Sequence, residues 1–161
     1  MTTRLDAAAR GIATHPFALS ARQGRTRAPL ELHGTSVLVK LASADTGSVA
    51  SVVHATIPPM AGPPLHRHTR EDEWFYVLKG EITLEFDGQR ILLHPGDCAF
   101  SPRGVAHAFQ NFGDTPAQMM AVIVPGQIDR LFEEMSAGQS ARMEELALEY
   151  GVEILGPPLS Q

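Results

Sequence analysis

Two histidines and a glutamate near the middle of the chain have residue types and a spacing that suit a metal ion. His66 and His68 are separated by one residue, and Glu73 lies five residues beyond His68. Residues two apart in a β-strand share a face, so the two imidazoles can converge on one point. Glu73 has the wrong parity for a continuous strand and reaches that point only if the chain bends within the polar run 69–72. The stretch is equally compatible with a polar edge strand whose histidines are incidental.

Regular alternation resumes after the expected bend. Glu73, Phe75 and Val77 would share one face of a strand that ends at Gly80. We therefore interpret the stretch as strand, tight bend and strand, with two imidazoles and one carboxylate directed inward. Glu71 and Asp72 are expected to stay in the solvated bend.

Short alternating runs also occupy the rest of the central region. They are bounded by turn-forming residues such as Asp87-Gly88, a strong hairpin signal. The expected strands fall at about 32–41, 48–57, 65–68, 73–79, 82–86, 91–93, 98–100, 105–112 and 117–124, and a rigid loop at 58–64 precedes the third of them. Eight to ten short strands at regular spacing predict an all-β sandwich or barrel.

The hydrophobic period changes after Pro125. Apolar residues then recur at helical spacing, first at Ile128, Leu131, Phe132 and Met135, and again at Met143, Leu146, Ala147 and Tyr150. We expect two helices that cover a mouth or flank of the barrel. The predicted organisation is an N-terminal arm over 1–29, flexible in its first dozen residues, a barrel over 30–125, and C-terminal helices and a tail over 126–161.

Composition narrows the range of functions. The chain has 161 residues and a formal net charge of −5, and only two of its 13 basic residues are lysines, which argues against nucleic acid as a partner. The single cysteine, Cys98, excludes an intrachain disulfide and a thiolate zinc cage. No apolar run approaches the roughly 20 residues that span a bilayer. Charged residues near the N-terminus interrupt the apolar stretch that a signal peptide would need. We expect a cytoplasmic protein without a membrane partner.

A second stretch complements the first. Gly96, Pro102, Gly104, His107 and Asn111 are spaced along the predicted strands that follow the hairpin. Together with His66, His68, Glu73 and Gly80, they resemble the two conserved motifs of the cupin family. The glycine that opens the first cupin motif is missing, because its position is occupied by Met60 and the nearest glycine is Gly62.

The resemblance implies a fold and a cofactor. The fold would be a double-stranded β-helix jelly-roll barrel with a short C-terminal helical extension. His66, His68, Glu73 and His107 would hold one divalent transition metal ion, with Mn, Fe, Co, Ni, Cu and Zn all compatible with such nitrogen and oxygen ligands. Taken alone, His107 is also compatible with a hydrogen-bonded core histidine. The family resemblance further implies a homodimer.

More narrowly, the chain is similar to small bacterial quercetinase-like cupins, which implies a dioxygenase acting on a small molecule, a flavonol or another enolic aromatic. Glu73 would then be both ligand and general base. The candidate residues for the apolar wall of the substrate pocket are Phe75, Val77, Phe86, Phe100, Phe109, Met119 and Ile123. Two alternatives stay open: a metal-dependent isomerase or lyase acting on a small polar substrate, and a non-enzymatic barrel that binds or senses a small molecule.

Overall fold

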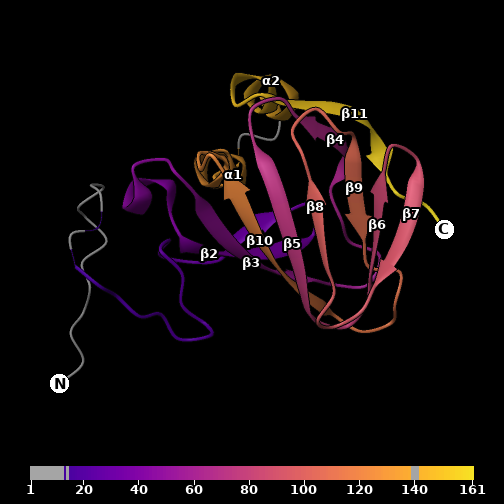
Figure 1. The fold of residues 1–161 in the computed structure, drawn as a ribbon, viewed down its shortest axis with the longest axis horizontal. Helices are drawn as coiled ribbons and strands as arrows, with labels where there is room; N and C mark the ends of the chain where they lie inside the picture. The colour runs from indigo at the N-terminus through magenta and orange to yellow at the C-terminus, as the bar shows by residue number, and fades with distance from the viewer. Residues whose placement is uncertain (1–12, 14, 139–141) are drawn as a thin grey trace.

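The computed structural model describes residues 13, 15–138 and 142–161, and two β-sheets dominate it (Figure 1). The predicted flexibility of the first dozen residues therefore lies outside the described part of the chain. The strands are β1 (Leu30–Leu32), β2 (Thr35–Leu41), β3 (Ser51–Ile57), β4 (Pro64–His68), β5 (Asp72–Lys79), β6 (Ile82–Phe86), β7 (Gln89–Leu93), β8 (Cys98–Ser101), β9 (His107–Gln110), β10 (Ala117–Val124) and β11 (Val152–Pro158). The helices are the 3-10 helix η1 (Ser43–Thr46) and the α-helices α1 (Ile128–Ser136) and α2 (Met143–Glu149).

The two sheets are antiparallel and have a jelly-roll arrangement. The six-stranded sheet has the order β1-β2-β3-β10-β5-β8, and the five-stranded sheet has the order β11-β4-β9-β6-β7. The predicted all-β jelly roll with a helical extension is thereby confirmed. No helix in the described ranges has the length and apolar character needed to cross a membrane.

Strand β5 shows why the alternating pattern produces this fold. Glu73, Phe75 and Val77 are all at most 7% exposed, and their side chains face the interior as their shared parity predicted. Strand β10 lies between β3 and β5, with Ile123 opposite Glu73 and Met119 opposite Val77. The inner faces of these strands therefore form a largely apolar layer in which Ser51 and Glu73 are the polar residues.

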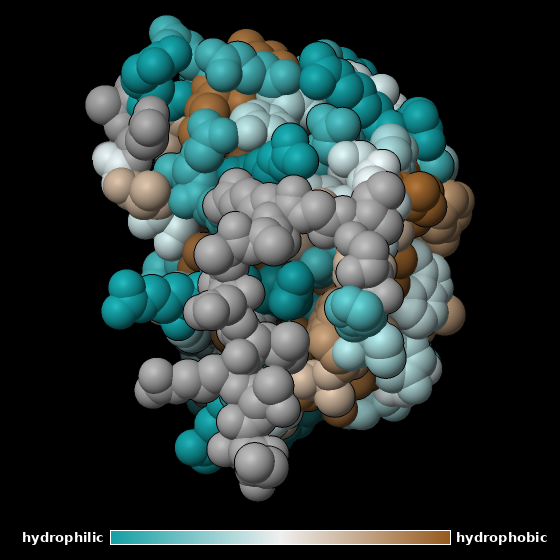
Figure 2. All heavy atoms as spheres, turned by 90° about the vertical axis from the view of Figure 1, so that its left-hand side faces the viewer, coloured by the Kyte–Doolittle hydropathy of each residue, from teal (hydrophilic) through white to brown (hydrophobic). Residues whose placement is uncertain are grey.

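Helix α1 lies against the six-stranded sheet on the side that carries β1 and β2. Ile128 and Leu131 are buried, and Phe132 and Met135 pack against the same core, so the predicted apolar stripe is confirmed. The buried carboxylate of Asp129 accepts hydrogen bonds from the backbone N–H and the hydroxyl of Ser43. Helix α1 is thereby attached to η1 as well as to the core. Figure 2 shows this side of the molecule, where apolar side chains appear in small patches between hydrophilic ones.

The end of the chain differs from the sequence-based prediction. The segment after Gly151 was expected to be a closing tail, but Val152–Pro158 forms β11 and pairs with β4, placing Val152 opposite His68 and Ile154 opposite His66. The pairing was not evident from the sequence because Gly156 and two prolines interrupt the alternation, which is tolerated on an edge strand. The C-terminal segment thus supports the strand that carries two of the candidate ligands. The division of the chain at residues 29 and 125 stays a prediction.

Candidate metal centre

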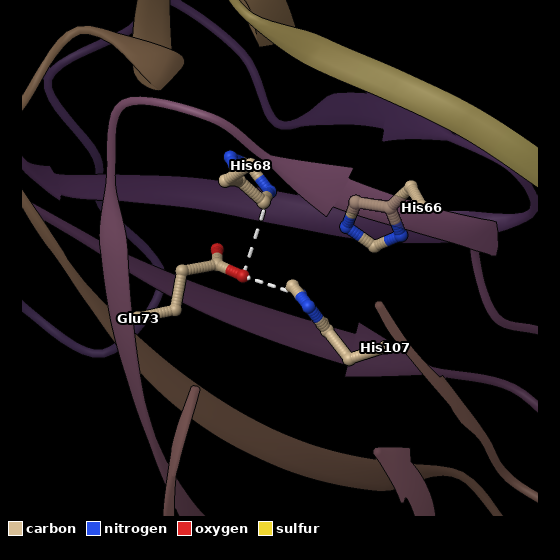
Figure 3. Close-up of side chains that lie close together, drawn as sticks. All are labelled: His66, His68, Glu73 and His107. Atoms are coloured by element: carbon tan, nitrogen blue, oxygen red, sulfur yellow. Dashed lines mark hydrogen bonds and ion pairs between the residues drawn. The ribbon is translucent and has the colours of Figure 1, made fainter. Parts of the chain in front are cut away.

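Four side chains from both sheets converge inside the barrel. His66 and His68 extend from β4, His107 from β9 and Glu73 from β5, and Figure 3 shows all four directed toward one another. Each offers one ligand atom, and these four atoms lie within 4.8 Å of one another. The bend between β4 and β5 brings Glu73 into the group despite its parity, while the pairing of His66 with His107 aligns the two strands of the second sheet.

Glu73 lies between two of the imidazoles. Its Oε2 is 2.8 Å from Nε2 of His107 and 3.5 Å from Nε2 of His68. The ring centroids of His66 and His107 are 4.5 Å apart, and those of His66 and His68 are 5.1 Å apart. On both His68 and His107, Nε2 is therefore the ring nitrogen that faces the carboxylate of Glu73.

The other nitrogen of His66 and of His107 faces a backbone carbonyl oxygen. Nδ1 of His66 is 2.8 Å from the carbonyl oxygen of Pro64, and Nδ1 of His107 is 3.1 Å from that of Val105. The hydroxyl of Ser101 also lies 3.1 Å from Nδ1 of His107. A proton held on Nδ1 by such an acceptor leaves Nε2 with a free electron pair, which is the form that binds metals.

Nδ1 of His68 faces a carboxylate at ion-pair distance instead, and the position of that carboxylate corrects the sequence-based expectation. Glu71 is 3% exposed rather than solvated, and its Oε2 lies 3.4 Å from Nδ1 of His68. Asp72 is partly exposed and forms an ion pair with Arg103. A signal for Glu71 was present in the sequence, because it has the same parity as Glu73 and is followed directly by β5.

The buried charges change the proton affinities of the cluster. Burial raises the pKa of Glu73, but charged His68, the hydrogen bond from His107 and the charges of His107 and His66 outweigh it and lower the pKa to about 2. Burial lowers the pKa of His68, but Glu73 and Glu71 outweigh burial, so the pKa is raised. Glu73 is thus a carboxylate at neutral pH, with His68 as its main cationic partner.

His66 behaves differently. Burial, followed by repulsion from His107 and His68, lowers its pKa to about 3. Its imidazole is therefore neutral at physiological pH. A neutral imidazole can act as a ligand without first losing a proton.

The donor set fits a divalent transition metal. Three neutral imidazoles and one carboxylate leave a divalent ion with one net positive charge, and nitrogen and oxygen donors of this kind suit the ions from Mn to Zn. Without a metal ion, the charge of His68 compensates the buried carboxylate, and a bound ion would take over that role. The four residues can therefore hold a metal ion, whose identity the donors do not define.

An apolar cavity adjoins the cluster. Its volume is about 120 Å³, and His66, His68 and Glu73 are part of its wall. Of the residues proposed for the substrate pocket, Phe75, Phe109, Met119 and Ile123 line this cavity. These four come from β5, β9 and β10, so both sheets contribute to it.

The other three proposed wall residues do not line the cavity. Phe100 is 58% exposed and lies opposite Trp74 on the outer face, because its parity in β8 is that of Trp74 and not that of Phe75. Val77 is completely buried in the core further along β5. Phe86 lies behind the cluster, with its ring centroid 6.3 Å from that of His107.

Comparison with known proteins agrees with this geometry. A family model described as a cupin domain matches residues 53–123. The oxalate-binding protein of Thermotoga maritima is 34% identical over 68 residues, which cover 42% of this chain and 56% of that protein. Quercetin 2,3-dioxygenase of Bacillus subtilis is 34% identical over 70 residues, which cover 44% of this chain and 20% of that enzyme. The chain thus spans about half of the first relative and a fifth of the second.

A solved structure shares the fold. The crystal structure of a Thermotoga maritima protein described as a predicted oxalate decarboxylase superposes with a TM-score of 0.55 at 27% identity, over 56% of this chain and 80% of that one. The jelly roll, the matched domain and the two motifs agree. Residues 53–123 therefore match a cupin domain in sequence, in fold and in the arrangement of the four possible ligands.

Proposed function

We propose that this protein is a metal-dependent dioxygenase that acts on a hydroxylated, enolic aromatic compound. The observation that carries the proposal is the position of the three histidines and Glu73 beside a cavity with apolar walls. The similarity to quercetin 2,3-dioxygenase over 70 residues adds support.

His66, His68, Glu73 and His107 would hold the ion. When bound, a divalent ion would act as a Lewis acid that lowers the pKa of a substrate hydroxyl. Glu73 is the one carboxylate among the described residues that line the cavity, so it is placed to accept the hydroxyl proton. Phe75 and Phe109 would hold the flat ring, and the apolar wall would exclude water. Both atoms of dioxygen would enter the organic product, with the substrate as the electron source and no further reductant.

The first test is elemental analysis followed by an oxygen-uptake assay. We expect near-stoichiometric Mn, Fe, Co, Ni, Cu or Zn in the purified protein, its loss in His107→Ala, and its retention in His94→Ala, a control that removes an exposed histidine. The metal-loaded protein should consume dioxygen when a panel including catechol and 3-hydroxyflavone is added. Bound metal without uptake on any hydroxylated aromatic would refute the dioxygenase proposal.

A binding protein without catalysis is the second candidate, because the oxalate-binding protein of Thermotoga maritima is among the relatives. The cavity argues against a dianion such as oxalate, since no lysine or arginine is among the described residues that line it. Calorimetric titration of the metal-loaded protein with oxalate separates the two candidates. Tight oxalate binding with no turnover would favour the second.

A further inference from the structure

The cavity beside the metal ligands has almost no polar wall. Among the described residues that line it, the polar or charged side chains are His33, Thr35, His66, His68 and Glu73, and three of these belong to the ligand cluster. The rest of the wall is proline, aliphatic, methionine and phenylalanine side chains from both sheets and from α1 and α2. A ligand in this space would therefore meet polar groups mainly at the cluster.

The size of the cavity limits what it can hold. Its volume is about 120 Å³, and an apolar protein cavity of about 150 Å³ is known to take up a single benzene ring. Helices α1 and α2 contribute Leu131, Phe132 and Ala147 to the wall, so the helices as well as the sheets bound this space. A three-ring flavonol exceeds this space.

The charge of the wall limits the ligand further. Glu73 already faces the imidazoles of His68 and His107, and the arginines that flank the ligands are engaged elsewhere. Arg67 pairs with Glu153, Arg103 pairs with Asp72, and Arg70 donates to the carbonyl oxygen of Glu149. In the metal-free protein, a carboxylate or phosphate on the ring would therefore be buried without an unpaired cation, which is costly.

We propose that the cavity binds an uncharged compound with a single aromatic ring, whose hydroxyl group faces the histidine cluster. The inference rests on the proposed function only in treating this cavity as the substrate site. It replaces the flavonol of the sequence-based prediction with a smaller substrate class. Phe132 on α1 and Ala121 on β10 then determine how large a ring system can enter, because both side chains form part of the wall.

The test compares three probes on the full-length protein at pH 7.5, as purified and again after removal of metal by chelation. Phenol, benzoate and 3-hydroxyflavone would be titrated, with affinities obtained from NMR chemical-shift changes of the methionine methyl groups. We expect phenol to bind at least tenfold more tightly than 3-hydroxyflavone in both states and than benzoate in the metal-free state, and to shift the Met119 methyl signal. Equal binding of 3-hydroxyflavone in either state or of benzoate in the metal-free state, or no binding of phenol, would overturn the inference.

Two cavity variants test whether the probes bind in this cavity. Ala121→Leu fills the cavity and should weaken phenol binding at least tenfold, whereas Ala21→Leu adds the same atoms at an exposed site and should leave it unchanged. Phe132→Ala removes a ring from the wall and so enlarges the cavity, and it should raise the affinity for 3-hydroxyflavone at least tenfold. Unchanged affinities in both cavity variants would contradict the assignment, and if a variant does not fold, the three-probe comparison on the unmodified protein still decides.

The two proposals fail separately. Phenol binding, with no dioxygen consumed when any single-ring compound is added, would refute the dioxygenase proposal and leave the cavity assignment intact. Dioxygen consumption with 3-hydroxyflavone but no binding of phenol would refute the cavity assignment and leave the dioxygenase proposal intact.

Discussion

Nδ1 of His68 lies 3.4 Å from Oε2 of Glu71, and the two side chains are 4% and 3% exposed. The opposite nitrogen of the same ring faces Glu73. His68 therefore lies between two buried carboxylates, one within the proposed ligand set and one behind it. A carboxylate behind a metal-bound histidine fixes the orientation of the ring and raises its basicity.

Glu71→Gln should weaken metal binding while leaving the four ligands in place. The amide keeps the shape of the side chain but removes the negative charge that faces Nδ1, so we expect about a 10- to 100-fold loss of affinity. Competition between the protein and a chromogenic zinc chelator measures the change. Glu81→Gln, which alters a carboxylate that is 60% exposed, is the control. Equal zinc affinity in all three proteins would mean that Glu71 does not support His68.

The sequence predicted the site better than its surroundings. Alternation in β5 and the two motifs placed Glu73 and the three histidines, because ligand spacing and strand parity are local properties. Phe100 was assigned to the pocket although its parity is that of Cys98, which is exposed. Residue type alone does not separate a pocket phenylalanine from a surface one, and only the register with β5 does so.

Strand β11 could not be predicted for a related reason. Its pairing with β4 joins residues more than 80 positions apart, and its sequence contains a glycine and two prolines. Long-range pairing depends on the whole fold and leaves no signal in a short window. Glu71 was expected to be solvated because it lies in the bend, but its side chain has the parity of Glu73 and is buried beside His68.

Met60 occupies the position at which the cupin motif has glycine, and the backbone explains why glycine is usual there. Met60 has a φ of 60°, and the N–H of Ala61 donates to the carbonyl oxygen of Pro58 across the turn. A positive φ at this position of a turn favours glycine. The chain therefore departs from the motif in residue type while keeping the conformation that the motif requires.

Met60→Gly should stabilise the protein. Relief of the left-handed strain outweighs the added flexibility of the unfolded chain, and the Met60 side chain is 56% exposed, so little packing is lost. We expect a gain of about 1 kcal/mol and a rise in Tm of about 2–4 °C. Met60→Ala, which removes the side chain but keeps the strain, is the matched control. Calorimetry that finds the glycine variant no more stable than the alanine variant would contradict this account.

Asn111 connects two loops through a fully satisfied buried amide. Its Nδ2 donates to the carbonyl oxygens of Ile57 and Thr115, each at 2.8 Å, and its Oδ1 accepts from the N–H of Gly113. The side chain is 1% exposed. The motif asparagine therefore has a structural role and holds these backbone groups rather than a metal ion.

Asn111→Ala should destabilise the protein by about 3 kcal/mol. It leaves three backbone groups without their partners, and each unsatisfied buried group costs about 1–3 kcal/mol before water compensates. Urea unfolding measures the loss, with Gln89→Ala at an exposed position of β7 as the control. A loss within 0.5 kcal/mol of the control, a range usual for surface sites, would show that the amide does not hold the loops.

The metal-free protein should lose stability in acid through Glu73. The pKa of this carboxyl is about 2 in the folded protein and 4.5 in its unperturbed form. The folded state is therefore favoured above pH 4.5, and this contribution is lost as the pH falls toward 2. It amounts to about 3 kcal/mol at most, from 1.36 kcal/mol per pKa unit. In Glu73→Gln the contribution is absent at every pH.

Urea unfolding of chelated protein between pH 6 and pH 3 measures this difference. The free energy of unfolding of the unmodified protein should exceed that of Glu73→Gln by its largest margin near pH 6. The margin should narrow below about pH 4.5, because the protonated glutamate then resembles glutamine in charge. Glu81→Gln should run parallel to the unmodified protein over the whole range. A margin that stays constant down to pH 3 would mean that the imidazoles do not hold Glu73 in its ionised form.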